Sequence, residues 1–399
     1  MREITFFDDL FKVNLLPLTT LMPACKIRVG IETIEEKWVR RLNTQRTFYQ
    51  TSTNLSSVYS PGDEKGDRLF INGRICPNEE WVSALLRLKP GQALYIGEIP
   101  LAVYGSDQNL ALENGLVANT VNCEKIDVAG AGSILSEPYD VFLKNETELK
   151  ADFERITKGR KSAKIAASNT VLGTEVFVEE GAVVECSVLN SESGPIYIGK
   201  DAVVMEGCMI RGGFAMNEKA TLKMGAKIYG ATTLGMHVKA GGEVNNSVIF
   251  DYSNKGHDGF LGNAVIGSWC NLGADTNNSN LKNNYGHVRC WSYKTERMEN
   301  TGLQFCGLIM GDFSKTGINT MLNTGTVTGV AANIFGGGFP PKFVPDFSWG
   351  GAEGFAEYNL EKALEAAGRM MERRQKKLTA AQCDILTGIF QQTRRLRTN

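Results

Sequence analysis

The chain has 399 residues, 42% of them hydrophobic, so it is long enough for two or three domains with sizeable cores. Its 43 Lys and Arg residues nearly balance its 44 Asp and Glu residues, which leaves no excess of positive charge for nucleic acid or an anionic membrane surface. We therefore expect small-molecule partners, with no nucleic acid and no membrane.

The first residues, MREITFFDDLF, mix charges with apolar residues and lack the continuous apolar core of a signal peptide. No later run approaches the length of a membrane span. The nine cysteines are scattered singly, without a CxxC pair, and we expect reduced and mostly buried thiols. Together these features predict a cytoplasmic protein.

Residues 1–150 alternate two kinds of segment. REITFF, RLFING and ALYIGEIPLAVY are typical of strands, whereas IETIEEKWVRRL and NEEWVSALLRLK are typical of amphipathic helices. This alternation predicts a three-layer α/β domain.

Within this domain, NLLPLTTLMPACKIRVG (residues 14–30) resembles the opening segment of sugar nucleotidyltransferases. The matching positions are Leu15, Pro17, Leu18, Thr19 and Pro23. The resemblance implies a nucleotidyltransferase-like fold, with Thr19, Lys26 and Arg28 as candidate nucleotide-binding residues. It is equally consistent with the sequence that Lys26 and Arg28 are solvated surface charges without a role in binding.

The phosphate-binding parts of that family do not match. The glycine-rich loop is replaced by DDLFKVN, and Arg74 stands where the strand LFINGRICP would end in a Mg²⁺-binding aspartate. Asp8 and Asp9 would repel phosphates unless a metal ion lay between them. Mg²⁺ is therefore implied only if the N-terminal domain is active.

The segment NETELKADFERITKGRKSAK predicts a helix that Asn145 caps and Gly159 ends. We expect residues 151–165 to be a helical linker between two domains.

Aliphatic residues recur at every sixth position in the middle of the chain. The longest register is Ile198, Val204, Ile210, Met216, Leu222, Ile228 and Leu234; shorter stretches contain Leu172, Val178, Val184, Ile266 and Leu272. Helices and ordinary strands repeat at 3.6 and 2.0 residues, so this period indicates a parallel β-helix, in which each step adds one short strand and one corner. We expect the β-helix over residues 166–345; its resemblance to hexapeptide-repeat proteins implies a left-handed coil.

A regular β-helix needs no loops, so we expect function at interruptions of the repeat. The main ones are VNNSVIFDYSNKGHDGF, NNSNLKNNYGHVRCWSYKTERMENTG and IFGGGFPPKFVPDFSWGG. The last is expected to be a proline-aromatic strap. Residues 346–399 then contain two helical patterns, expected to cap the last coil or to pack on a neighbouring subunit.

The segment KGHDGFLGNAVIGSWCNLGADT (residues 255–276) resembles, without gaps, the acetyltransferase half of the bifunctional N-acetylglucosamine-1-phosphate uridylyltransferase/glucosamine-1-phosphate acetyltransferases. The resemblance implies His257 as general base and Glu243 as the carboxylate that orients it. A neutral imidazole suits that role because its pKa is ordinarily about 6.5. It also implies substrate contacts by Lys227, Asn271, Asn280 and the backbone amide of Ala274, with that amide stabilising the thioester oxyanion.

The same resemblance implies acetyl-CoA as acyl donor, Lys315 as its main basic contact, a homotrimer with active sites between subunits, and a place in cell-envelope biosynthesis. The departures concern phosphate binding. Phe260 replaces an aromatic hydroxyl, Asn245 replaces a lysine and Lys227 replaces an arginine. A pocket without these phosphate ligands would favour a different amino-sugar or a nucleotide-linked sugar as acceptor. The resemblance and its departures together leave two expected acceptors, an amino-sugar phosphate and a nucleotide-linked amino-sugar.

Other functions stay open at this point. One is a sugar-1-phosphate nucleotidyltransferase, forming UDP- or dTDP-sugars, whose β-helix only trimerises it; another is a non-catalytic sugar-nucleotide-binding assembly. A zinc site is not expected, because His237, His257 and His287 are 20 and 30 residues apart, without the short-range pair of trimeric β-helix carbonic anhydrases.

Overall fold

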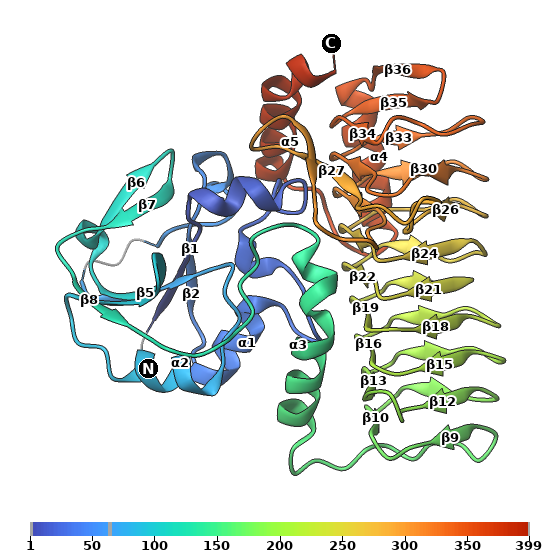
Figure 1. Ribbon diagram of the computed structural model, residues 1–399, viewed down its shortest axis with the longest axis horizontal. Coiled ribbons are helices and arrows are strands. Elements are labelled where there is room, and N and C mark those ends of the chain that lie inside the picture. Colours follow the sequence, from blue (N-terminus) through green and yellow to red (C-terminus); the bar gives the residue numbers. More distant parts are fainter. Residues whose placement is uncertain (1–2, 63–65, 398–399) are drawn as a thin grey trace. The chain divides into compact units, whose positions relative to one another are not determined.

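The computed structural model describes residues 3–62 and 66–397 (Figure 1). The chain divides into two compact units, described here one at a time. The first contains Met1–Leu15, Leu21–Ile27 and Glu32–Glu137; the second contains Leu16–Thr20, Arg28–Ile31 and Pro138–Asn399.

The first unit is built on a mixed sheet with the strand order β2-β1-β3-β5-β4-β8. Three expected apolar runs form its centre, as β1 (Ile4–Phe7), β3 (Arg68–Asn72) and the hairpin of β4 (Gln92–Ile96) and β5 (Ile99–Gly105). The edges are β2 (Thr47–Gln50) and β8 (Glu124–Asp127), and a separate hairpin joins β6 (Leu110–Glu113) to β7 (Leu116–Thr120).

Both expected helices of this unit are present, as α1 (Ile34–Leu42) and α2 (Glu79–Leu86). A capping box between Thr33 and Glu36 begins α1. Each helix buries one tryptophan whose indole N–H is satisfied: Trp38 donates to the carbonyl of Ile75 at 2.8 Å, and Trp81 to that of Ala129 at 3.0 Å. The expected α/β class is confirmed for this unit.

The second unit contains a parallel β-helix with three faces, which the chain visits in the order A, B, C. Face A contains β9 (Thr170–Leu172), β12 (Val188–Asn190), β15 (Met209–Arg211), β18 (Lys227–Tyr229), β21 (Glu243–Asn245) and β24 (Phe260–Gly262), and continues through β26 (Asn277–Asn278) and β31 (Met321–Leu322). Face B contains β10 (Val176–Val178), β13 (Ile196–Ile198), β16 (Phe214–Met216), β19 (Thr232–Leu234), β22 (Val248–Ile249), β25 (Val265–Ile266), β29 (Ile309–Met310), β32 (Val327–Thr328) and β34 (Phe343–Val344).

Face C begins with β11 (Val183–Val184), β14 (Val203–Val204), β17 (Thr221–Leu222), β20 (Lys239–Ala240) and β23 (Asn254–Lys255). A single bridging residue, Asn271, connects it to β30 (Lys315–Thr316), β33 (Asn333–Ile334) and β35 (Ser348–Gly351). The last strand, β36 (Gly354–Glu357), pairs antiparallel with β35. The expected β-helix is confirmed.

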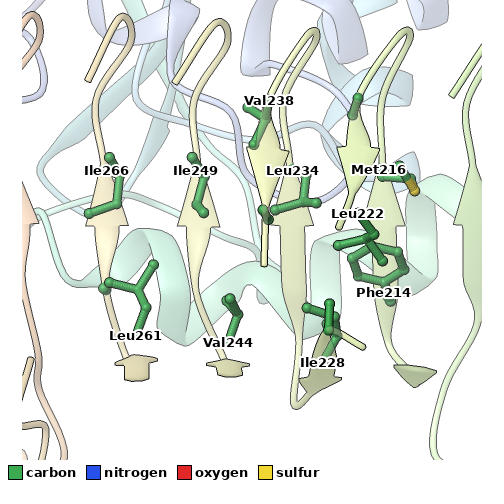
Figure 2. Packing of buried hydrophobic residues seen from close by; sticks show 14 of the residues in the cluster. Phe214, Met216, Leu222, Ile228, Leu234, Val238, Val244, Ile249, Leu261 and Ile266 are labelled. Atoms are coloured by element: carbon green, nitrogen blue, oxygen red, sulfur yellow. The ribbon is translucent and has the colours of Figure 1, made fainter. Parts of the chain in front are cut away.

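The interior of the prism is a continuous column of aliphatic side chains (Figure 2). Every residue of the six-residue register is buried except Leu172, which is 42% exposed. That assignment was wrong by one position, because Val171, the partner of the inward Leu189, takes the inward position of the first coil.

The coils are not all of one length. Ile198, Met216 and Leu234 are 18 residues apart on face B, whereas Ile249 follows Leu234 by only 15. The coil that ends at Ile249 is therefore three residues short, and residues 244–260 continue the coils of the β-helix instead of forming the interruption expected from the sequence. The real insertion lies between Ile266 and Met310, and contains a hairpin of β27 (Arg289–Ser292) and β28 (Arg297–Asn300).

The helix expected to begin at Asn145 begins five residues earlier, as α3 (Asp140–Thr157). Asn145 is fully buried, where it accepts from the N–H of Gly30 at 2.7 Å and donates to the carbonyl of Ala231 at 2.8 Å. The helix packs beside face B, where Leu149 and Phe153 share an apolar cluster with Ala215 (Figure 1). The segment around residues 151–157 is thus part of this unit, and a cap at Asn145 was the wrong reading.

The proline-aromatic strap is a further coil, because β34 and β35 continue faces B and C. The two C-terminal helices are confirmed as α4 (Leu360–Glu372) and α5 (Ala380–Gln392). Short 3₁₀ turns occur at Leu10–Leu15, Ala24–Lys26, Thr53–Leu55, Asp107–Asn109 and Arg394–Leu396. Among the described residues there is no disulfide, and no helix is long and apolar enough to cross a membrane.

Candidate functional site

His257 lies at the corner where the chain turns from face C to face A, between β23 and β24. Its side chain is exposed. The corner lies close to the coils on either side, and glycines make the approach possible. A Cβ at Gly242 would stand 2.9 Å from the carbonyl oxygen of His257, and one at Gly259 would stand 2.3 Å from that of Thr276.

Lys255 fixes this corner from inside the prism. It occupies an inward position equivalent to that of Ala240, and only 2% of its surface is exposed. Its Nζ donates to the carbonyl oxygens of His257 at 2.5 Å, Asp258 at 3.1 Å and Gly241 at 3.3 Å. Burial lowers the pKa of Lys255 to about 8, against the opposing effects of Asp258 and Asp275. The ammonium group thus holds the backbone that carries His257.

His257 lines a pocket of about 340 Å³ on face C. We call it the cationic pocket, because its wall includes Lys223 and Lys239 from the face and Arg373 and Arg374 from the end of α4. Arg374 donates to the carbonyl of His237 at 3.5 Å, which connects this end of the helix to the β-helix. The C-terminal end of α4 therefore completes a pocket on the side of the prism.

Aromatic rings form a second part of the pocket wall. Tyr252 and Trp269 line it, and their rings stack at 4.2 Å with 3° between the planes. The stack extends to His237 and Phe313, at 5.2 and 6.3 Å. All four residues occupy one corner position with φ between 58° and 66°, a conformation that is strained for bulky side chains and that ring stacking offsets in part.

Positive charge is concentrated in the cationic pocket. The pKa of Lys239 is lowered by burial first, and then by the charges of Arg374, Lys223 and Arg373. Among the described residues, no carboxylate lines the pocket.

Glu243 lies on the outward side of face A, between Lys227 and Phe260 of the neighbouring strands. Its carboxylate accepts from the hydroxyl of Tyr229 at 2.5 Å. Burial and this carboxylate raise the pKa of Tyr229 to about 12. Within the described residues, no hydrogen bond joins the side chains of Glu243 and His257.

The other expected substrate contacts are spread over two faces. Asn271 is exposed, lines the cationic pocket and bridges Asn254 and Lys315 on face C. Asn280 donates to Asn263 at 2.8 Å, and the exposed Lys227 lies on face A. The pocket thus brings together His257 and Asn271 of the expected residues, and does not include Lys227, Glu243 or Asn280.

Ala274 lies in the coil that follows His257, three residues after Asn271, and Lys315 pairs with Asn271 from the coil after that. Among the described residues the N–H of Ala274 donates to no protein acceptor, whereas its carbonyl accepts from Asn319 at 2.8 Å. That N–H is therefore available for a ligand. Lys315 is half-buried, donates to the carbonyl of Phe313 at 3.1 Å and has a pKa lowered by burial.

The sequence contained weak signals for the residues that were missed. Lys255 stands at an inward position that the shortened coil hides from a strict six-residue count. Arg373 and Arg374 belong to the basic run ERRQKK. The local sequence does not predict that this run lies beside face C.

Asp8 and Asp9 of the first unit already have positively charged partners within the protein. Asp9 accepts from the guanidinium of Arg74 at 2.8 and 3.0 Å and from Asn72 at 2.9 Å, all with buried side chains. Asp8 lies 3.0 Å from Lys12 and accepts from Thr51 at 2.5 Å. The described residues contain no group of three His, Cys, Asp or Glu side chains that could hold a metal ion. Mg²⁺ does not fit this arrangement, so we derive no step through it.

The three candidate nucleotide contacts are largely engaged within the protein. Lys26 pairs with Glu35 at 2.5 Å in the first unit. In the second unit, Thr19 is buried, and Arg28 donates to the carbonyl of Ile31 at 2.6 Å and lies 3.3 Å from Asp251. These partners give Lys26 and Arg28 a structural role in their own units.

Comparison with known proteins gives one family match. Residues 4–161 match the sequence model of a family described as sugar nucleotidyl transferase. No curated protein matches the chain. Many solved structures are similar to parts of it, including the following two. The polySia-specific acetyltransferase NeuO is 14% identical, covering 52% of this chain and 100% of its own, with a TM-score of 0.28. The Arabidopsis UDP-N-acetylglucosamine acyltransferase is 17% identical, covering 53% and 80%, with a TM-score of 0.25.

Proposed function

We propose that this chain is an N-acyltransferase that moves an acetyl group from acetyl-CoA to the amine of an amino-sugar phosphate or a nucleotide-linked amino-sugar, with His257 as general base. The main support is the position of His257. Its exposed imidazole lines a pocket, and the buried ammonium group of Lys255 donates a hydrogen bond to its backbone carbonyl oxygen. The resemblance of residues 255–276 to the acetyltransferase half of the bifunctional family supports the same reaction.

The residues present support a simple sequence of events. The imidazole of His257 accepts a proton as the sugar amine attacks the thioester carbonyl carbon. A C–N bond forms, the carbonyl oxygen becomes an oxyanion, and the N–H of Ala274 donates to it. The C–S bond then breaks, and the proton held by His257 goes to the departing thiolate. Acetyl transfer is thereby balanced without any other reactant.

The proposed assembly is a homotrimer. The outward side of face A carries exposed apolar side chains; for example, Met209 is 50% exposed and Met321 is 38% exposed. Ile318, at the corner between β30 of face C and β31 of face A, is 70% exposed. Exposed apolar patches of this kind are typical of subunit interfaces. Sedimentation equilibrium of the purified chain tests this, and a monomer at micromolar concentration would contradict it.

The test of the reaction is a free-thiol assay with acetyl-CoA and amino-sugar phosphates. His257→Ala should lower kcat on the order of 10²- to 10⁴-fold, the range for loss of a general base. His287→Ala is the matched control, because this exposed histidine lies outside the pocket. Full activity of His257→Ala would remove the assignment of the base.

A second candidate function is favoured by the family match over residues 4–161, namely sugar-1-phosphate nucleotidyl transfer. Pyrophosphate release from UTP or dTTP with a sugar-1-phosphate measures it directly. The ion pair of Asp9 and Arg74 favours the result that this unit releases no pyrophosphate. Release of pyrophosphate without release of thiol in the acyl-transfer assay would make the β-helix a scaffold. No product in either assay would favour a sugar-nucleotide-binding assembly without catalysis.

A further inference from the structure

The cationic pocket gathers four positive side chains beside His257. Lys239 is the first residue of β20, and Lys223 directly follows β17, the strand of face C that pairs with β20 through Thr221 and Lys239. Arg373 and Arg374 come from the end of α4. Charges of one sign this close repel one another, and the lowered pKa of Lys239 reports that repulsion together with burial.

An anionic ligand would relieve this repulsion. No carboxylate among the described residues lines the pocket, so the protein does not supply the counter-charge there. Arginine and lysine side chains are the usual protein partners of phosphate, and guanidinium groups bind it with paired hydrogen bonds. The charge pattern therefore favours a phosphate group.

The rest of the wall favours a sugar attached to that phosphate. Tyr252 and Trp269 give an aromatic surface, and Asn254 and Asn271 add side-chain amides that can exchange hydrogen bonds with hydroxyl groups. The volume of about 340 Å³ lies at the small end of the range for ligand sites, about 300–1,000 Å³. That size suits a monosaccharide phosphate better than a complete nucleotide-sugar or coenzyme A.

We propose that the cationic pocket binds the phosphate monoester of an amino-sugar phosphate, with Lys239 and Arg373 among its ligands and the sugar amine directed to His257. The inference rests on the proposed function and selects one of its two acceptor classes. It also accounts for Phe260 and Asn245, which carry no charge: the phosphate contacts come from face C and α4, on a different side of the prism from those residues of face A.

Binding without an acyl donor tests the inference separately from catalysis. Isothermal titration of the full chain would use glucosamine-1-phosphate, glucosamine-6-phosphate, glucosamine and inorganic phosphate. We expect at least one sugar phosphate to bind on the order of 10- to 100-fold more tightly than glucosamine, with inorganic phosphate competing. Glucosamine binding as tightly as both sugar phosphates would overturn the proposal.

The variants Lys239→Met and Arg373→Met remove one charge each while keeping much of the side-chain length. Their combination should weaken binding of the sugar phosphate and of inorganic phosphate by on the order of 10- to 100-fold and leave glucosamine binding unchanged. Lys377→Met, an exposed charge beyond α4 and outside the pocket, is the matched control and should bind as the wild type does. Circular dichroism confirms that each variant is folded.

Two results separate this inference from the proposed function. If the sugar phosphate binds and the double variant weakens it while no thiol is released, the pocket assignment stands and acyl transfer fails. If thiol is released but the KM for the acceptor is the same in the double variant, the pocket assignment fails alone. Coenzyme A also carries phosphate groups, so it is titrated in the same way. If the double variant binds coenzyme A more weakly but binds the sugar phosphate as the wild type does, the pocket belongs to the acyl donor and the proposal is overturned.

Discussion

The Nζ of Lys255 lies inside the β-helix, 2.5 Å from the carbonyl oxygen of His257. An aliphatic side chain would suffice to fill this inward position, as Ala240 and Leu272 do in the adjacent coils. The lysine instead satisfies three backbone carbonyls at the corner that presents the imidazole. A buried cation is expensive to desolvate, so its presence here points to a requirement for the corner's geometry.

Replacing Lys255 by methionine should therefore separate activity from stability. Lys255→Met should lower kcat for acyl transfer by about 10- to 100-fold, because small displacements of a catalytic group have large effects on rate. The melting temperature should stay the same or rise, because an apolar side chain of similar length avoids the desolvation of a buried charge. Thiol-release kinetics and differential scanning calorimetry measure the two effects.

Leu234→Met is the control for this experiment, since it changes a buried inward side chain of face B, outside the cationic pocket, without changing charge. It should lower stability by less than about 1.5 kcal/mol and leave kcat unchanged. Lys255→Arg keeps the charge and should recover part of the activity. A large fall in melting temperature for Lys255→Met, in proportion to its loss of activity, would mean that the lysine acts on stability only.

The pH dependence of stability provides a second test of Lys255. Its pKa in the folded protein is about 8, below the value of about 10.4 for an unfolded lysine. Between these values the unfolded chain binds more protons, so the free energy of unfolding rises with pH by up to about 1.4 kcal/mol per unit from this residue. Urea unfolding at pH 8, 9 and 10 should show this rise in the wild type relative to Lys255→Met. Parallel curves would contradict it.

The regular part of the fold could be predicted from local pattern. The six-residue period identified the inward residues from Val178 to Leu234, because each prism step repeats the same packing problem. The segments of the first unit followed from alternation and amphipathicity in the same way. The misplacement of the start of α3 has a tertiary cause: Asn145 resembles a helix cap in isolation, but its amide is used by Gly30 and Ala231.

The candidate site was only partly predictable for a similar reason. His257 and Asn271 were identified by resemblance, and the pocket contains both. Arg373 lies more than 100 residues further along the chain, and only the return of α4 along the β-helix places it near Lys239. Local sequence holds no information on that return. The shortened coil before His257 also concealed Lys255, since a strict period placed no inward residue there.

In the first unit, the buried pair of Asp9 and Arg74 should be a stability element. Arg74→Met should lower the free energy of unfolding by about 3–5 kcal/mol, because it leaves a buried carboxylate without its partner. The double variant Asp9→Asn/Arg74→Met should recover much of that loss, since no unpaired charge remains. Chemical denaturation of the two single variants and the double variant gives the coupling energy. Additive losses would show that the pair is not coupled.

Asp312 should make the β-helix less stable as pH rises toward neutrality. Its Oδ1 accepts from the N–H of Ser268 at 2.7 Å, and burial raises its pKa to about 7. Because the unfolded value is about 3.9, the folded protein binds more protons between pH 4 and pH 7, and the free energy of unfolding falls with rising pH in that window. Asp312→Asn keeps the acceptor oxygen and removes the titration.

Urea unfolding at pH 5, 6 and 7 measures this effect. The free energy of unfolding should fall more steeply with pH for the wild type than for Asp312→Asn, by up to about 1.4 kcal/mol per pH unit. Equal slopes would show that Asp312 stays ionised in the folded protein across this range.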